Sequence, residues 1–283
     1  MRLAAERGVS ALALTDHDTV AGLAEASAAA DRLGIDFLPG IEVSCAHPRP
    51  GTLHLLGYGF DIDHPAMRHL TRVLANARAE RAERIAQALG RAGVEVSVND
   101  VVAHAGRTGR PHFAKVLIDR GHAVSTRDAF DRYLGGSGVA YVENNPLSAE
   151  QVIPLVRAAG GLCSLAHPFQ LRRATFEQLE AMIRELAEQG MEGLETLHGS
   201  HTDEQVHRLT RLADRLELIP TGGSDFHGAA KPWIRLGEAG RRTIAREAYE
   251  AIVERLSVRS RRFADDLQGG DVLEMAAVVG HQR

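Results

Sequence analysis

Cysteine is scarce in this sequence, which has only Cys45 and Cys163 among its 283 residues. Two thiols are too few for a disulfide scaffold or for a zinc site built from cysteines alone. Both lie in apolar runs that are typical of strands. We therefore expect two buried, reduced thiols, as in a protein that folds in a reducing compartment.

Long hydrophobic runs and an excess of positive charge are also absent. No apolar run approaches the roughly 18 residues of a membrane span, and the amino terminus lacks the basic stretch and hydrophobic core of a signal peptide. The 33 basic and 37 acidic residues give a net charge of -4, which provides no overall attraction to nucleic acid or anionic lipid. We expect a cytoplasmic protein that has no membrane partner, does not bind DNA stably, and binds phosphate only locally.

What is present is the composition and periodicity of an α/β protein. Hydrophobic residues make up 44% and charged residues 25%, which excludes the disordered and fibrous classes. Short apolar runs alternate with helical patterns, which predicts a mainly parallel sheet, open or closed into a barrel. The predicted strands cover 11–15, 35–43, 52–60, 161–166, 193–197 and 218–222, and the main predicted helices cover 20–33, 67–91, 149–159, 175–189, 203–215, 244–255 and 272–279.

An Ala/Arg/Glu-rich stretch interrupts this alternation. It contains the long helix at 67–91 and predicts shorter helices at 99–105, 112–119 and 126–134. We therefore divide the chain into a first barrel part (1–63), a helical insertion (64–146), and a second barrel part with a carboxyl-terminal tail (147–283).

Histidines and carboxylates follow the predicted strands. In parallel α/β folds, active sites lie at the carboxyl ends of the strands, so these residues are candidates for one site. The motifs are TDHD at 15–18, GIEVS at 40–44, HLLGY at 54–58, AHP at 166–168 and GSDFH at 223–227.

Each motif taken singly has a structural alternative. His17 could cap a helix, His54 could be a hydrogen-bonded core histidine, and Glu42 could pair with an arginine. The joint pattern favours a shared site, because every strand end would otherwise carry a ligand type by coincidence. Imidazole with carboxylate and no thiolate suits Zn, Mn or Fe, and a bridging carboxylate such as Glu42 can hold two ions for metal-assisted hydrolysis.

The order of these motifs resembles the PHP (polymerase and histidinol phosphatase) family, especially the bacterial branch of 3′,5′-nucleotide bisphosphate phosphatases and 5′-to-3′ exoribonucleases of the RNase AM type. The resemblance runs from residue 1 to about 230 and includes the helical insertion. It implies a distorted seven-stranded β/α barrel with two to three divalent ions, Mn first and Zn or Fe as alternatives. The metal ligands that it implies are His17, Glu42, His54, His167, Asp225 and His227, with Glu42 as the bridge.

Two motifs of that family are missing from this sequence: an amino-terminal His-x-His and a Ser-Asp-Gly turn. The resemblance therefore implies a barrel that lacks its first strand and three ligands. We weigh two accounts, a start assigned at an internal methionine of a longer, active protein, and a short chain with weak or no catalysis.

Substrate-binding candidates lie in the insertion and after a later strand. Arginines commonly grip phosphate, and Arg107, Arg110 and His112 surround a predicted helix start, although solvated arginines are the alternative. Ser200 and His201 could contact a phosphate or the leaving group, and His201 could equally precede the helix as a capping element. A base or ribose could contact Tyr141, Asn144 and Asn145.

The sequence thus predicts a metal-dependent phosphoric ester hydrolase. Its expected substrates are nucleotide 3′,5′-bisphosphates or the 5′ ends of short RNA, attacked by a metal-activated hydroxide with Glu42 and His201 as catalytic residues. One alternative is a small-metabolite phosphatase of the histidinol-phosphate type, against which the helical insertion argues. Another is a catalytically impaired metal-binding module.

Overall fold

The computed structural model describes residues 1–46, 53–105, 108–143, 147–171, 175–228 and 231–269. Its centre is a six-stranded sheet in which the strands lie in chain order. All six predicted strands are confirmed, as β1 (Ala11–Leu14), β2 (Asp36–Cys45), β3 (Leu53–Tyr58), β4 (Leu162–Leu165), β5 (Gly193–His198) and β6 (Ile219–Gly223). Within the described residues, β1 and β6 are the outer strands, so the sheet is a curled half-barrel consistent with a PHP-type barrel.

The direction of β3 differs from the expectation of a largely parallel sheet. β1–β2, β4–β5 and β5–β6 are parallel, but β3 pairs antiparallel with both of its neighbours. The reason is the connection from β2, because residues 46–52 are too few for the crossover that a parallel pair requires. β3 therefore presents its first residues, rather than its last, at the edge where β2 ends.

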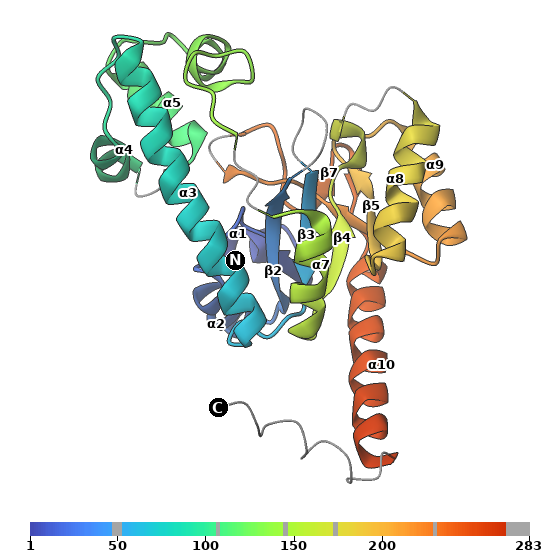
Figure 1. Ribbon diagram of the computed structural model, residues 1–283. Helices are drawn as coiled ribbons and strands as arrows, with labels where there is room; N and C mark the ends of the chain where they lie inside the picture. Colours follow the sequence, from blue (N-terminus) through green and yellow to red (C-terminus); the bar gives the residue numbers. More distant parts are fainter. Residues whose placement is uncertain (47–52, 106–107, 144–146, 172–174, 229–230, 270–283) are drawn as a thin grey trace, which may run out of the picture.

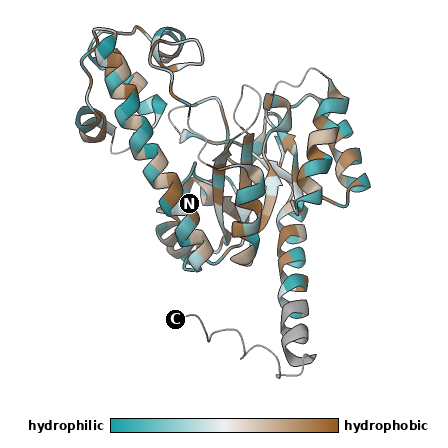
Figure 2. Ribbon diagram, viewed as in Figure 1, coloured by the Kyte–Doolittle hydropathy of each residue, from teal (hydrophilic) through white to brown (hydrophobic). Residues whose placement is uncertain are grey.

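Amphipathic helices cover the sheet and bury its apolar side chains (Figure 1). In Figure 2 the central strands are mostly hydrophobic, whereas the surrounding helices carry both hydrophobic and hydrophilic residues. Cys45 and Cys163 lie in the main core, buried and free, as predicted. The covering helices are α1 (Arg2–Glu6), α2 (Leu23–Leu33), α7 (Ala149–Ala158), α8 (Phe176–Glu188) and α9 (Asp203–Arg215), with a short 3-10 turn at Pro168–Leu171.

Local capping sets the bounds of these helices. Thr175 and Thr202 accept hydrogen bonds from the third residue of α8 and α9, which satisfies backbone N–H groups that have no helical partner. α2 ends at Gly34, whose φ of 66° is left-handed and suits glycine. α2 starts later than the predicted helix at 20–33, because residues 20–22 form a turn.

The helical insertion has a hydrophobic core of its own. It contains α3 (Pro65–Arg91), α4 (Val98–Ala105), α5 (Arg110–Asp119) and α6 (Thr126–Ala129), and Phe113 is fully buried among them. The predicted helix at 126–134 is only in part α-helical, because Phe130–Leu134 continues as a π-turn in which Gly135 N–H donates to the Phe130 carbonyl.

α3 connects this second core to the sheet. Its first half buries Leu70 and Leu74 in the main core, while its second half buries Ile85 and Leu89 in the insertion core. A single helix that packs into both cores fixes the direction in which the insertion extends from the sheet (Figure 1).

The carboxyl-terminal part packs a long helix against the outer strand of the sheet. A hairpin of β7 (Glu238–Ala239) and β8 (Arg242–Thr243) precedes α10 (Glu247–Gly269), which contacts β6 and buries Ile252. The predicted helix at 244–255 therefore begins later and runs longer than expected, and the one predicted at 272–279 lies outside the described residues. No described helix is both long enough and apolar enough to cross a membrane.

We predict that Phe113→Ala destabilises the helical insertion. The ring is fully buried in the insertion core, so its removal should lower the free energy of unfolding by about 3–5 kcal/mol, measured by urea denaturation. Val124→Ala is the matched control, because that side chain is 89% exposed and its loss should change stability little. Equal effects of the two substitutions would contradict the insertion core.

Candidate metal centre

Strand register brings His17, Glu42 and His54 together. His17 forms a parallel bridge with Glu42, flanked by a hydrogen bond from Asp18 N–H to the Glu42 carbonyl at 2.8 Å. In the antiparallel β2–β3 pair, Ser44 lies opposite His54, so His54 and Glu42 are diagonal neighbours on one face. His54 reaches the site because it stands at the start of β3, not at the carboxyl end that the sequence pattern suggested.

The carboxylate of Glu42 is the centre of this cluster. Its Oε1 lies 2.7 Å from His54 Nδ1 and 3.1 Å from His167 Nε2, while its Oε2 lies 3.4 Å from His17 Nδ1. The residue is buried, so water does little to stabilise its charge. Three histidines from three different strand ends therefore surround one carboxylate, and no arginine in the described part of the chain forms an ion pair with it.

One ligand atom each from His17, Glu42 and His54 lies within 4.8 Å of the other two, so the three side chains could hold a metal ion. His54 Nδ1 and His167 Nε2 are 3.2 Å apart, and both approach the same oxygen of Glu42. Donor atoms placed about 2.1 Å from one ion lie roughly 3.0–3.4 Å from each other. The two oxygens of Glu42 also face different histidines, as a bridging carboxylate would. The donor set thus fits Zn, Mn or Fe.

Buried histidine nitrogens give a second indication. Among the described residues, His167 Nδ1, His198 Nε2 and His201 Nε2 are buried and have no hydrogen-bond partner. An unsatisfied buried polar atom costs about 1–3 kcal/mol, so such atoms call for an explanation. His198 stands closest to the cluster, with its ring centroid 5.6 Å from that of His167, and the sequence interpretation did not select it.

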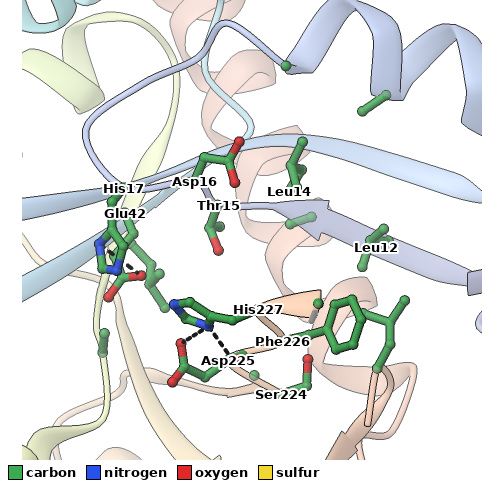
Figure 3. Close-up of a pocket in the computed structure, with 18 of the residues that line it drawn as sticks. Leu12, Leu14, Thr15, Asp16, His17, Glu42, Ser224, Asp225, Phe226 and His227 are labelled. Carbon is green, nitrogen blue, oxygen red and sulfur yellow. Dashed lines mark hydrogen bonds and ion pairs between the residues drawn. The ribbon is translucent and has the colours of Figure 1, made fainter. Parts of the chain in front are cut away.

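Asp225 and His227 form a second group across the pocket. Figure 3 shows this pair opposite His17 and Glu42, and the rings of His17 and His227 are 6.1 Å apart. Asp225 accepts a hydrogen bond from the Lys231 ammonium at 2.8 Å and lies 3.3 Å from His227 Nδ1. The six residues proposed as ligands therefore all lie around one pocket.

Among the described residues, three of the four non-glycine residues with a positive φ lie at these strand ends, and the fourth is Glu217 after α9. Asp18, His167 and Asp225 have φ values of 54°, 28° and 52°, which side chains other than glycine rarely adopt. Asp18 follows β1, His167 follows β4 and Asp225 follows β6. Such strain persists where the surrounding structure determines the conformation, and it is typical of functional sites.

Charge and burial set the protonation of the cluster. Burial acts to raise the pKa of Glu42, but hydrogen bonds from His167 and His54 hold it well below its usual range. Burial lowers the pKa of His17 and, with the nearby His167, lowers that of His198 to about 4. These two rings are therefore neutral near pH 7, which is the form that binds metal ions.

Glu195 is a buried carboxylate that sequence reasoning missed. It lies in β5, 3% exposed, and its Oε2 accepts a hydrogen bond from His167 N–H at 2.6 Å. Burial raises the pKa of Glu195 to about 7, helped by the negative charges of Glu42 and Asp225. The available signal was a glutamate within the predicted strand GLETLH, which also contains His198.

A cavity contains the metal cluster, and only some of the predicted substrate-binding residues line it. Arg110, His112 and Tyr141 line it together with the metal cluster. His112 also accepts a hydrogen bond from Gly109 N–H at 3.0 Å at the start of α5. Arg107, Asn144 and Asn145 lie outside the described residues.

Ser200 and His201 are not among the described residues that line this cavity. Ser200 is exposed and its Oγ lies 2.7 Å from His198 Nδ1, whereas His201 is buried with Nδ1 3.0 Å from the Thr196 carbonyl. Only a donor can bond a carbonyl, so Nδ1 of His201 carries the proton and its buried Nε2 does not when the ring is neutral.

The metal cluster and arginines of the insertion line one cavity of about 2130 Å³. It extends from His17, Glu42 and Asp225 to Arg78 and Arg110 of the insertion, and along the outer edge of β1. Arg78 holds the insertion against the cluster, because its guanidinium donates to the His17 carbonyl and lies 3.2 Å from the Asp18 carboxylate. The insertion therefore forms one wall of the cavity that contains the candidate metal centre.

Comparison with known proteins agrees with this arrangement. The PHP domain model matches residues 1–196. The chain belongs to the PHP domain family. A 3′,5′-nucleoside bisphosphate phosphatase of Chromobacterium violaceum is 36% identical over 84% of this chain and 81% of its own length. A 5′-3′ exoribonuclease of Haemophilus influenzae is 34% identical over 82% of this chain and 84% of its own length.

A solved structure of another protein has the same fold as this chain. The protein from Bifidobacterium adolescentis, assigned to the metal-dependent phosphoesterases, superposes with a TM-score of 0.76 at 31% identity. The superposition covers 90% of this chain and 88% of that one. These relatives place the chain among the PHP phosphoesterases.

We predict that Glu195 makes stability depend on pH in the metal-free protein. Its folded pKa of about 7 exceeds the ordinary value of 4.5, so between these values the folded state binds more protons than the unfolded state. The free energy of unfolding should therefore fall as pH rises from about 4.5 to about 7, by up to about 3 kcal/mol from this group.

Urea denaturation of the EDTA-treated protein across this pH range measures the effect. Glu195→Gln should remove this component, because the amide still accepts from His167 N–H but does not ionise. Glu188→Gln, an exposed glutamate at the end of α8, is the control and should keep the wild-type dependence. An unchanged pH profile in Glu195→Gln would show that the carboxyl of Glu195 does not titrate in this window.

Proposed function

We propose that the chain is a metal-dependent phosphoesterase that acts on the phosphomonoester of a nucleotide 3′,5′-bisphosphate or on the 5′ end of RNA. The observation that carries this proposal is the buried Glu42 carboxylate, shared by three histidines in a cavity whose other wall bears arginines. The named activities of the Chromobacterium and Haemophilus relatives support the substrate class.

The residues that would hold the divalent ions are His17, Glu42, His54, His167, Asp225 and His227. When bound, such ions supply activated water near neutral pH and neutralise the charge of the phosphate. Glu42 would orient the histidines around it, and Glu195 would position His167 through its backbone N–H. Manganese is the first choice, with zinc or iron as alternatives.

Two side chains are candidates to donate a proton to the leaving oxygen of the substrate. His201 suits the role of proton donor poorly, because burial lowers its pKa and it does not line the described cavity. Lys231 does line the cavity, and its ammonium 2.8 Å from Asp225 can donate a hydrogen bond or a proton. We therefore assign His201 to support of the site, through the Thr196 carbonyl and its ring contact with His198.

A catalytically impaired metal-binding module is the second candidate. The observation that favours it is that, in the part of the chain that the structure describes, β1 and β6 are the outer strands of the sheet and the cavity continues along the edge of β1. A small-metabolite phosphatase shares the metal cluster, but it does not explain the arginines of the insertion wall.

We predict that the protein binds divalent metal through Glu42. Glu42→Gln should lose most of the bound Mn and should lower phosphoesterase activity at least about a hundredfold, because the amide cannot bridge two ions. Metal analysis after mild purification measures the binding, and Glu188→Gln is the control with an exposed glutamate. Full metal content in Glu42→Gln would remove Glu42 from the centre of the site.

We predict phosphate release from nucleoside 3′,5′-bisphosphates, or mononucleotide release from 5′-phosphorylated RNA, in the presence of Mn²⁺. EDTA should abolish both activities, and added Mn²⁺ should restore them. Colorimetric phosphate detection and chromatography of the RNA products distinguish the two substrates. Bound metal without either activity would favour the impaired module.

A further inference from the structure

His198 has one ring nitrogen with hydrogen-bond partners and one without. The residue is 4% exposed, stands at the end of β5 and lines the cavity that contains Glu42. In the part of the chain that the structure describes, its Nε2 is buried and forms no hydrogen bond. A buried polar atom in this position costs about 1–3 kcal/mol, so we expect a group that compensates the cost.

The contacts of Nδ1 decide where the ring of His198 carries its proton. The Ser200 backbone N–H donates to Nδ1 at 3.1 Å, and Ser200 Oγ lies 2.7 Å from the same atom. A backbone N–H can only donate, so Nδ1 presents its lone pair and carries no hydrogen. The proton of the neutral ring is therefore on Nε2. This nitrogen is a hydrogen-bond donor and has no lone pair with which to bind a metal ion.

The carboxylate of Asp225 is an acceptor close to this donor. Its Oδ2 lies 4.0 Å from His198 Nε2, and a shift of about 1 Å would bring the two atoms within hydrogen-bond distance. The Lys231 ammonium holds the same oxygen at 2.8 Å. One oxygen of a proposed metal ligand thus lies between a cation and a neutral donor.

The two donors have opposite effects on a cation site. The ammonium of Lys231 repels a divalent ion held by the same carboxylate, and this repulsion is strong between charges a few ångströms apart in a partly buried site. A neutral imidazole N–H adds no positive charge, yet it fixes the orientation of the carboxylate. The side chain of Lys231 is 36% exposed and can turn toward water, whereas His198 is buried beside Asp225.

We propose that His198 is a positioning residue of the metal centre, which donates Nε2–H to the Asp225 carboxylate and replaces Lys231 there when Asp225 holds a divalent ion. The inference rests on the proposed metal-dependent function for the role of Asp225. The exchange leaves the Lys231 ammonium free on the wall of the cavity, where the leaving oxygen of a substrate could accept from it. His198 itself binds neither the ion nor the substrate.

Mn²⁺ binding to the full, EDTA-treated and desalted protein tests this role by isothermal titration calorimetry. His198→Leu resembles the ring in volume but removes the donor, so it should weaken Mn²⁺ binding by about 10–100-fold. His198→Gln retains an N–H group at a similar reach, and its affinity should return to within severalfold of the wild type. A packing role would give the reverse order, because leucine suits a buried position better than glutamine.

His207→Leu is the matched control for the loss of an imidazole. His207 is exposed on α9 and does not line the described cavity, so this variant should bind Mn²⁺ as the wild type does. Lys231→Met removes the ammonium that competes for Asp225 and should tighten Mn²⁺ binding severalfold. Unchanged or weaker binding in Lys231→Met would refute the exchange of partners.

Nuclear magnetic resonance with isotope-labelled histidine reads the hydrogen bond itself. The signals of His198, identified by their loss in His198→Gln, should show a proton on Nε2 and none on Nδ1. Addition of Zn²⁺, a diamagnetic ion, should move the Nε2 proton downfield, because its hydrogen bond to a carboxylate becomes short. These signals and Lys231→Met test the proposal even if His198→Leu fails to fold, which circular dichroism would show.

Wild-type Mn²⁺ affinity in His198→Leu would overturn the proposal, as would the packing order of affinities or a proton on Nδ1. Loss of the Nε2 proton on addition of Zn²⁺, or no Mn²⁺ binding by the wild type, would also overturn it. Failure of the proposed function looks different. In that case the Mn²⁺-loaded wild type would release no phosphate from nucleoside 3′,5′-bisphosphates and no mononucleotides from 5′-phosphorylated RNA, while the dependence of Mn²⁺ affinity on His198 would remain.

Discussion

The arrangement of the active region depends on the buried negative charge of Glu42. A carboxylate at 7% exposure is stable only if other groups replace the water it has lost. His54 and His167 do so with two contacts to one oxygen, and His17 approaches the other. The same geometry suits a divalent ion, because the three histidine rings that contact the carboxylate are also metal donors. The same contacts therefore stabilise the buried charge of Glu42 and bring together the donors of the candidate metal centre.

The surrounding fold holds this charge by imposing unusual local conformations. Left-handed backbone at Asp18, His167 and Asp225 turns three strand ends toward one another, and the sheet supplies the packing that maintains the strain. Glu195 supports His167 from the adjacent strand, and Arg78 ties the insertion to the loop after β1. Because α3 packs into both hydrophobic cores, the insertion is held next to the metal centre, and residues of both line a single cavity.

Much of the fold could be predicted because its signals are local. The strands and the helices around them follow from the hydrophobic period, and ligand-type residues near the strand ends indicate the site. Two kinds of feature could not be predicted in this way. The antiparallel direction of β3 depends on a short connection, and His54 reaches the site from the start of its strand. The segment that contains Glu195 and His198 was predicted only as a core strand. The contacts that place these two residues beside the metal cluster form only in the folded protein.

The sequence by itself determined the residue types, their order and the family, because donor chemistry and periodicity are properties of the chain. It also indicated an insertion with arginines near a helix start. Tertiary structure alone decided which donors share Glu42, that Ser200 and His201 lie off the described cavity, and that Arg81 and Arg110 line it. The physical reason is that distance, burial and repulsion between charges arise only when separate segments pack together.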